Sequence, residues 1–290
     1  MLESPSYHKI ENNYIKQTLG GPLFLPNNTP YIFSCFALSS DGRLCYPDLK
    51  SGYAIANNNY AASPMERYAD FWNLNLGRAC ADAVLFGSNS LAEEHYTYSA
   101  AIAIPELQAV RRQLAQAKPL WHILITRDCN QIDFARELLT QDNALPLIIF
   151  SALPPQQTLE QQKLEHFTIV NFSDVACRPS NARPNRAPTW AKQIIVYPQL
   201  DLSQIINYLQ HLGIRNILNE SPYFHHRLQE LQLLQEAWLN TSAVYIGGSV
   251  ATLGQKNNSF TSSYHPHYSI LTLHHIGYNF LYTRYKIDYA

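Results

Sequence analysis

The sequence predicts a three-layer α/β protein, in which helices cover both faces of a mostly parallel, mixed sheet. Short apolar runs alternate with amphipathic segments along much of the chain, which is typical of strand–helix–strand units. These apolar runs are continuous, as expected for strands that are buried on both faces. Near the C-terminus, two segments of alternating polarity flank Gly277 and predict an antiparallel hairpin that closes the sheet.

The composition indicates one globular domain. The chain has 290 residues, of which 46% are hydrophobic and 15% are charged, and this is enough apolar material for a sizeable core. We expect an irregular leader over residues 1–29 and a single domain over residues 30–290. A Pro- and Asn-rich stretch at about 172–191 breaks the alternation, and we interpret it as a surface loop of that domain.

Charge, hydropathy and cysteine content exclude several classes of protein. The net charge of −1 provides no basic surface for nucleic acid. No run approaches the roughly 20 apolar residues of a membrane span, and the N-terminus lacks the apolar core of a signal peptide. The five cysteines are widely spaced without a C-x-x-C pair, which favours reduced thiols. We therefore expect a cytoplasmic protein that binds neither nucleic acid nor membranes.

The expected strands are apolar runs that end in turn-forming residues. The first run ends at a turn in which Asp41 can bond its own backbone and Gly42 can take a positive φ. The expected strands cover residues 31–38, 83–86, 121–126, 147–150, 167–170, 193–197, 214–219 and 241–246, and those of the hairpin cover 268–276 and 280–287.

Helices are expected where apolar residues recur at helical spacing behind a capping residue or a proline. Asp201 is such a cap, and Gly213 is the glycine that ends the same helix. On the helix that Pro105 opens, we interpret Arg111 and Arg112 as solvated surface rather than ligand contacts. The expected helices cover residues 66–78, 105–114, 132–139, 202–212 and the segment that begins at Pro222.

The turn after the strand 83–86 is the first candidate for a binding site, and it consists of Gly87, Ser88, Asn89 and Ser90. Glycine lets a ligand approach the backbone, and the N–H groups and small polar side chains can hold phosphate oxygens. The alternative is an ordinary tight turn, because one glycine and two serines are weaker than a full glycine fingerprint. The polar and aromatic segment 93–98 indicates that the next helix does not follow at once.

Several further motifs occur in a fixed order along the chain. They are Ser39-Ser40-Asp41-Gly42 for an S-x-D-G loop, Ser51-Gly52, Asp70 eight residues before Arg78, residues 78–87 for R-a-x-a-D-a-v-l-v-G, Glu93 or Glu94 with Tyr96, Asn219-Glu220 at the place of E-G-G-P, Gly247-Gly248, and the closing segment 281–285. In this order of motifs, over roughly residues 30–287, the chain resembles the riboflavin-biosynthesis (pyrimidine) reductase family, of the C-terminal reductase domain type. That resemblance implies a dihydrofolate-reductase-like fold.

The resemblance also implies a reaction: hydride transfer from NADPH to the sugar of a ribosylamino-pyrimidine or a related pyrimidine or pterin-like molecule. It implies a homodimer as well, formed through sheet edges. By position in the motifs, the implied catalytic residues are Asp41 and Glu220, the substrate-binding residues are Ser39, Arg78 and Glu94, and the cofactor-binding residues are Gly87, Ser88, Asn89, Ser90, Ser221, Gly247, Gly248 and Ser249.

The chain departs from the family pattern in ways that keep a second hypothesis open. Ser221 and Pro222 replace the two glycines of E-G-G-P, and proline has no N–H to offer a phosphate. Ala101 is apolar near a position where some relatives have an arginine that holds substrate phosphate. The alternative is therefore a diverged ligand-binding or scaffold protein without turnover. The histidines lack an H-E-x-x-H spacing, so no metal site is expected, and the residues do not decide between NADPH and NADH.

Overall fold

The computed structural model describes residues 7–10, 23–26, 29–93, 105–113, 119–140, 145–156, 164–176, 192–254 and 258–289. Ten of its strands form one sheet. They are β3 (Tyr31–Ser39), β4 (Ala83–Gly87), β5 (Trp121–Asp128), β6 (Leu147–Leu153), β7 (Phe167–Asn171), β8 (Lys192–Val196), β9 (Asn216–Asn219), β10 (Glu236–Ser242), β11 (His267–Ile276) and β12 (Phe280–Asp288).

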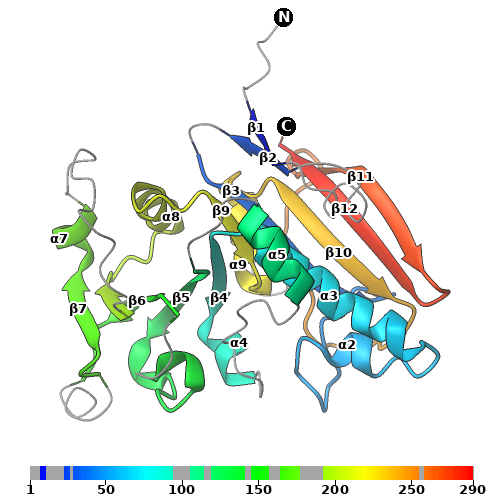
Figure 1. The fold of residues 1–290 in the computed structure, drawn as a ribbon, viewed down its shortest axis with the longest axis horizontal. Helices are drawn as coiled ribbons and strands as arrows, with labels where there is room; N and C mark the ends of the chain where they lie inside the picture. Colours follow the sequence, from blue (N-terminus) through cyan, green and yellow to red (C-terminus); the bar gives the residue numbers. More distant parts are fainter. Residues whose placement is uncertain are drawn as a thin grey trace, which may run out of the picture.

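The strand order in this sheet is β11-β12-β10-β3-β9-β4-β5-β6-β8-β7 (Figure 1). The strands from β10 to β7 run parallel, whereas β12 pairs antiparallel with both β10 and β11. The predicted α/β class is confirmed, as are the mostly parallel mixed sheet and the C-terminal hairpin.

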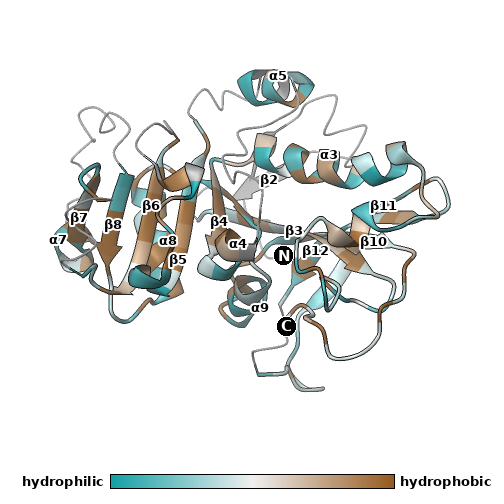
Figure 2. Ribbon diagram, turned by 90° about the horizontal axis from the view of Figure 1, so that it is seen from below, coloured by the Kyte–Doolittle hydropathy of each residue, from teal (hydrophilic) through white to brown (hydrophobic). Residues whose placement is uncertain are grey.

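Helices cover both faces of the sheet, which confirms the predicted three layers. They are α2 (Ala54–Asn57), α3 (Pro64–Cys80), α4 (Ser88–Glu93), α5 (Pro105–Gln113), α7 (Phe172–Ala176), α8 (Leu202–His211) and α9 (Pro222–Glu230). One apolar cluster packs Leu76 of α3 and Leu107 of α5 against one face, and a second packs Leu209 of α8 and Leu228 of α9 against the other. Figure 2 shows α3 and α5 above the sheet and α9 below it.

Local sequence explains how α3 begins and how closely it packs. Ser63 accepts a hydrogen bond from the Glu66 N–H while the Glu66 carboxylate accepts one from the Ser63 N–H, and Pro64 occupies the first turn. Near the other end, a Cβ at Gly77 would lie 3.3 Å from Leu218 and 3.4 Å from Trp238. Glycine therefore lets α3 approach the sheet closely.

The topology brings several strand ends to one place. Strand β9 lies between β3 and β4, although it follows both in the sequence. Because these strands are parallel, their carboxyl ends meet at the same edge of the sheet, where ligands bind in open α/β sheets. The turns after β3, β4 and β9 are therefore neighbours in space.

Some sequence expectations were wrong in detail. The expected strand 241–246 is in fact β10 and ends at Ser242. The expected helix 132–139 is wrong: this segment follows the 3₁₀ turn Cys129–Gln131 and ends in a second 3₁₀ turn, Glu137–Leu139. Helix α4 follows Gly87 at once, contrary to expectation.

Two expected irregular regions contain regular structure. Within the leader 1–29, β1 (Tyr7–Ile10) and β2 (Leu23–Pro26) form an antiparallel pair. The expected loop 172–191 begins as helix α7, and residues 177–191 lie outside the described residues. None of the helices in the described ranges has the length and hydropathy that a bilayer crossing requires.

Candidate functional site

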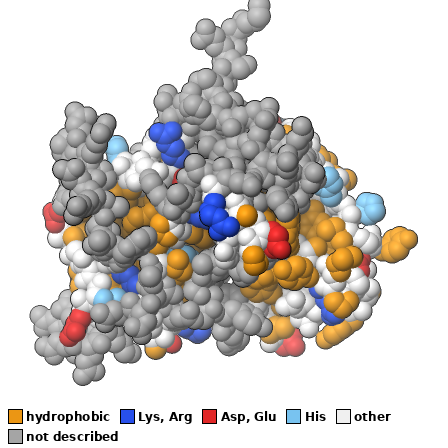
Figure 3. All heavy atoms as spheres, viewed as in Figure 1, with side chains coloured by type: hydrophobic (Ala, Val, Ile, Leu, Met, Phe, Trp, Pro, Cys, Tyr) orange, Lys and Arg blue, Asp and Glu red, His pale blue; other side chains and the backbone are white. Residues whose placement is uncertain are grey.

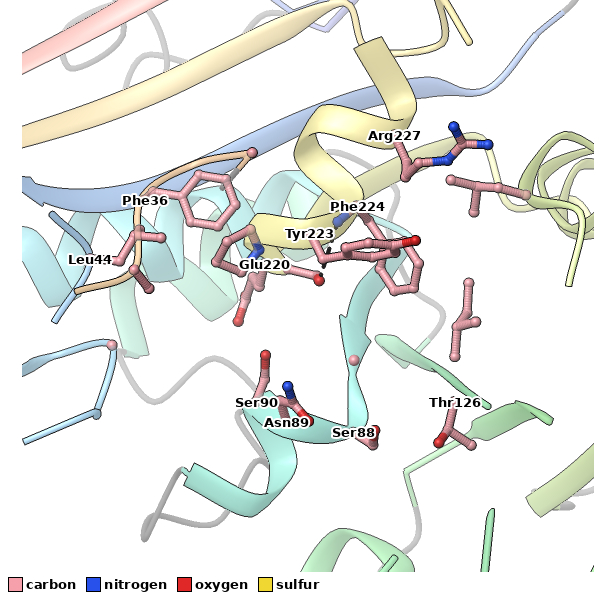
Figure 4. A pocket seen from close by; sticks show the side chains of 18 of the residues that line it. Phe36, Leu44, Ser88, Asn89, Ser90, Thr126, Glu220, Tyr223, Phe224 and Arg227 are labelled. Carbon is pink, nitrogen blue, oxygen red and sulfur yellow. Dashed lines mark hydrogen bonds between the residues drawn. The ribbon is translucent and has the colours of Figure 1, made fainter. Parts of the chain in front are cut away.

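A cavity of about 1300 Å³ lies at the carboxyl edge of the parallel strands. This is larger than the roughly 300–1,000 Å³ that is typical of small-molecule sites, so the cavity has room for two ligands side by side. Figure 4 shows Phe36, Glu220, Tyr223 and Phe224 on one side of it and the turn Ser88–Ser90 on the other. Leu44 and Thr126 lie towards its two ends.

Arg78 and Glu220 form a buried ion pair in the wall of this cavity. Arg78 Nε donates to Glu220 Oε1 and Nη2 donates to Oε2, each over 2.7 Å. The two side chains are 4% and 6% exposed, respectively. Arg78 comes from the last turn of α3 and Glu220 directly follows β9, so the pair ties a helix to a strand end. The bidentate geometry fixes both groups in one orientation towards a ligand.

Asp70 provides a second carboxyl group in the cavity wall. It lies on α3, eight residues before Arg78. It is 5% exposed, and its Oδ1 accepts a hydrogen bond of 2.7 Å from Asn240 Nδ2. Asn240 Oδ1 in turn accepts one of 2.8 Å from Asn73. Burial raises the pKa of Asp70 to about 6, although the bond from Asn240 lowers it. The sequence analysis did not identify Asp70 as a site residue.

The turn Gly87–Ser90 lines the cavity. A Cβ on Gly87 would lie 3.7 Å from Ser221 Oγ and 4.0 Å from the Phe224 ring, across the gap between β4 and α9. The absence of a side chain therefore widens the cavity at this point. The hydroxyl and amide groups of Ser88, Asn89 and Ser90 provide polar contacts beside it.

The start of α9 also lines the cavity, but two of the N–H groups there are already bonded within the chain. Ser221 Oγ accepts from the Phe224 N–H over 3.4 Å, and Asn219 Oδ1 accepts from the Ser221 N–H over 3.1 Å. Pro222 has no N–H to donate. What this helix presents to the cavity instead is aromatic, since the Tyr223 and Phe224 rings meet edge to face at 5.3 Å.

Asp41 and Ser39 are close to each other but do not line the cavity. Asp41 Oδ2 accepts from the Gly247 N–H over 2.8 Å, and Oδ1 accepts from the Ile246 N–H over 3.2 Å and from Ser39 Oγ over 2.6 Å. Arg43 Nε donates to Oδ2 over 3.3 Å. The Ser39 hydroxyl bond, followed by the backbone and Arg43 bonds, holds the pKa of Asp41 well below its usual range, although burial acts in the opposite direction.

Gly247 is therefore brought to Asp41, and none of Gly247, Gly248 and Ser249 lines the cavity. Gly247 and Gly248 have φ values of 73° and 65°, in the left-handed region that favours glycine. The clamp between Asp41 and Gly247 joins the loop after β3 to the loop after β10. In the same pair of loops, the Leu44 N–H donates to the Ala251 carbonyl over 2.9 Å, and both residues line the cavity.

The remaining expectations have mixed outcomes. Glu94 lies outside the described residues. Arg111, expected to be solvated, is 8% exposed and donates to the carbonyls of Arg78 and Ala81 at the end of α3, whereas Arg112 is exposed. The arginine thus satisfies carbonyl groups that a helix end leaves unpaired.

Two cations that the sequence reasoning missed also line the cavity. Lys50 and Arg127 are exposed, and neither forms an ion pair within the described part of the chain. Both lie in irregular or strand-end positions without a recognisable motif, so only the fold reveals that they share a cavity. Their charges favour an anionic ligand.

These residues fit a nicotinamide dinucleotide. The cavity volume, the hydroxyl-rich turn Gly87–Ser90, the Tyr223 and Phe224 rings, and the cations Lys50 and Arg127 match the phosphates and flat rings of such a ligand. The N-terminus of α9 is the exception, because Ser221 and Pro222 leave it a poor phosphate site.

Searches by sequence find no family model that matches the chain and no matching curated protein. Solved structures do match. One is a pyrimidine reductase-like protein from Corynebacterium diphtheriae, with 15% identity and a TM-score of 0.64 over 90% of this chain and 93% of that one. The chain has the fold of the pyrimidine reductases. The predicted resemblance and the dihydrofolate-reductase-like fold are thereby confirmed at the level of structure.

Two longer proteins share this fold. RibD of Acinetobacter baumannii matches with 14% identity and a TM-score of 0.58. A Thermotoga maritima diaminohydroxyphosphoribosylaminopyrimidine deaminase/5-amino-6-(5-phosphoribosylamino)uracil reductase matches with 10% identity and a TM-score of 0.54. Each match covers 90% of this chain, which spans 59% and 57% of the two proteins, respectively.

Proposed function

We propose that this protein is an NADPH-dependent reductase that transfers hydride to a ribosylamino-pyrimidine or a related pyrimidine or pterin-like substrate, as in riboflavin biosynthesis. The observation that carries the proposal is one cavity in which the buried Arg78–Glu220 pair lies opposite the turn Ser88–Ser90. The ordered motifs and the shared fold support the same conclusion.

In this proposal, the two sides of the cavity have different tasks. When bound, the cofactor supplies the hydride. The turn Gly87–Ser90 and Ser221 hold the cofactor, and Arg127 neutralises one of its phosphates. Arg78 and Glu220 orient the substrate, and their fixed geometry lowers the entropic cost of bringing the reactants together.

We assign Asp41 a positioning task, although the resemblance implies a catalytic one. Its carboxylate accepts hydrogen bonds from the loop after β10, including the one from Gly247. Through this clamp, Asp41 and Ser39 hold the cavity wall at Leu44 and Ala251. The role of Glu94 in substrate binding stays a prediction.

The test is a turnover assay with the purified chain. We expect loss of reduced-nicotinamide absorbance when NADPH and 5-amino-6-(5-phosphoribosylamino)uracil are both present, and slower loss with NADH. Calorimetry should detect NADPH binding without substrate. If no binding is seen at millimolar NADPH, the proposal is wrong.

The self-capped start of α9 favours the second candidate, a ligand-binding protein of the same fold without turnover. Restoration of riboflavin synthesis in a strain that lacks the reductase separates the two candidates. A binding protein would bind pyrimidines in calorimetry and still fail to restore growth without riboflavin.

We further propose that the chain forms a homodimer through the β11–β12 hairpin. Strand β11 is an edge strand of the sheet, and its Ile270 and Leu273 are 61% and 56% exposed. In Figure 3, hydrophobic side chains gather on the side where Figure 1 has α2, α3 and β10 to β12. Sedimentation should give twice the chain mass of 33.1 kDa, and a single-chain mass would contradict the dimer.

A further inference from the structure

We propose that Asp70 is the proton donor of the reduction, which extends the proposed reductase function to a residue that the motifs do not assign. Hydride addition to a carbon–nitrogen double bond leaves a pair of electrons on nitrogen, and a proton must reach that atom. A group that supplies it must lie in the cavity, carry a proton near neutral pH and be free to release it.

The position of Asp70 meets the first requirement. It lies on α3 in the same cavity wall as Arg78 and Glu220, and it is 5% exposed. Asn240 Nδ2 donates to Oδ1, so the proton of the neutral carboxyl group resides on Oδ2. Asn240 is itself held by Asn73, which fixes the orientation of the carboxyl group.

The charges around Asp70 meet the second requirement. Arg78, which lines the same cavity wall, is engaged by Glu220 through both carboxylate oxygens, so its charge is already balanced. Asp70 has no ion pair within the described residues. A buried carboxyl group without a cationic partner favours its neutral form.

In the described part of the chain, two further titratable groups interact with Asp70, and neither supplies a positive charge. They are Cys35 on β3 and Tyr282 on β12, and each interacts electrostatically with Asp70. Burial raises the pKa of both groups, so both are neutral at physiological pH. The Tyr282 hydroxyl is buried and makes no hydrogen bond within the described part of the chain. Burial raises the pKa of Asp70 itself to about 6, which is the range for an acid catalyst.

The chemical step balances with this donor. In the open-chain imine form of the ribosylamino group, hydride adds to the imine carbon and the C=N π electrons move to nitrogen. The proton on Asp70 Oδ2 moves to that nitrogen, which gives the C–N single bond of the amine. Within the described residues, the resulting carboxylate has no ion-pair partner. Water that enters the cavity after the product has left returns the proton.

The test compares Asp70→Asn with the wild type. The amide keeps an oxygen that can accept from Asn240 but carries no transferable proton. Asp70→Glu retains a carboxyl group and serves as the rescue variant. Asp174→Asn on α7 makes the same change at an exposed residue that does not line the cavity, and it serves as the matched control.

We expect Asp70→Asn to lower kcat by about 100-fold or more while NADPH affinity in calorimetry stays within about twofold. The kcat of the wild type should fall as pH rises above about 6, since the acid must be protonated, and this fall should be absent in Asp70→Asn. Infrared spectroscopy, which needs no activity, should show a protonated-carboxyl band that disappears over the same pH range and is missing in Asp70→Asn. Asp70→Glu should regain part of the rate, and Asp174→Asn should match the wild type.

The outcomes separate this inference from the proposed function. If the wild type oxidises NADPH and Asp70→Asn retains its kcat or its pH profile, Asp70 is not the donor and the reductase function stands. If the infrared band is absent from the wild type at pH 5, the inference is also wrong. If the wild type does not bind NADPH, the reductase function and the inference both fail.

Discussion

Two buried arginine–glutamate pairs lie at opposite edges of the parallel strands, and they have nearly the same geometry. Arg78 and Glu220 meet beyond the carboxyl end of β9, with both bonds at 2.7 Å. Arg284 of β12 and Glu236 at the start of β10 meet with both bonds at 2.6 Å, and each side chain is 4% exposed.

The surroundings of the two pairs differ. Glu236 also accepts from Trp238 Nε1 over 2.9 Å, and neither Glu236 nor Arg284 lines the cavity. Arg78 and Glu220 both line it. The same chemical pair thus locks the hairpin to the sheet at one edge and faces a ligand space at the other. Burial and bidentate bonding alone do not identify a functional ion pair. What distinguishes the functional pair is that it lines a cavity.

Breaking the structural pair should have the largest effect on stability. Arg284→Ala leaves the Glu236 carboxylate buried without a cation, and loss of one partner of such a pair costs about 3–5 kcal/mol. Urea unfolding should show this loss. Arg78→Ala should cost less, because water in the cavity can solvate Glu220. Equal losses in the two variants would contradict the distinction between the pairs.

Asp70 has a carboxyl group in the cavity wall that forms no ion pair within the described residues. Removing its charge should therefore stabilise the fold. Its folded-state pKa, about 6, is raised above the ordinary value, so its ionisation opposes folding. The resulting loss of stability develops as pH rises from about 4 to about 6 and is constant above. At pH 8, Asp70→Asn should therefore raise the unfolding free energy by up to about 3 kcal/mol.

The control for this prediction is the same comparison of wild type and Asp70→Asn at pH 4, where the residue at position 70 is uncharged in both proteins. There the difference in urea unfolding should shrink towards zero. A variant that is less stable than the wild type at pH 8 would show that the ionised form of Asp70 is stabilised by its surroundings.

Breaking the cavity pair conservatively should affect the ligand more than the fold. Arg78→Lys keeps the charge but loses the planar fork that binds two oxygens. One lost bond to a charged group corresponds to about 1.5–3 kcal/mol, or about 10–150-fold in kcat/KM for the pyrimidine substrate. Arg284→Lys is the matched control and should leave kcat/KM unchanged in steady-state assays. A similar loss in both variants would indicate a general structural effect.

The smallest effect is expected at Tyr223, which is 48% exposed and lines the cavity beside the capped start of α9. Tyr223→Ala removes a ring on which a flat ligand can stack, a contact of about 0.5–1.5 kcal/mol. We expect NADPH affinity in calorimetry to fall about 2–12-fold without a change in urea unfolding. Tyr223→Phe should bind like the wild type, and an unchanged affinity of the alanine variant would remove Tyr223 from the site.

The sequence predicted the fold well because burial on both faces leaves a strong pattern. The run from Ala83 to Phe86 is fully apolar and becomes the central strand β4. Strand β10 begins at Glu236 and not at residue 241 as expected, and this difference has a clear cause. Glu236 looks unsuited to a buried strand, but Arg284 compensates its charge from a distant segment, so the strand begins earlier than its apolar pattern suggests. A pairing over such a separation cannot be found from periodicity alone.

Local hydrogen bonds explain why residues 132–139 do not form the expected α-helix. Asp133 accepts a hydrogen bond from the Ala135 N–H over 3.0 Å, and the Leu139 N–H donates to the Arg136 carbonyl in a tighter turn. Aspartate competes with helical hydrogen bonds in this way. The apolar positions Ile132 and Leu139 are buried as expected, but the backbone between them is not an α-helix.

The candidate site was predicted in part. The turn Gly87–Ser90, Arg78 and Glu220 do line one cavity, because parallel strands bring their carboxyl ends together. Asp70 and Lys50 could not be identified, since burial and shared cavities depend on the complete fold. The motif at Gly247 was recognised, but only the structure reveals that its N–H binds Asp41.

A crystal structure of the protein soaked with NADPH tests the central claim most directly. We expect the cofactor phosphates within hydrogen-bonding distance of Ser88 or Ser90, with the nicotinamide ring between that turn and the Arg78–Glu220 pair. Cofactor phosphates that lie away from both Ser88 and Ser90, or a cavity without cofactor at millimolar NADPH, would contradict the account.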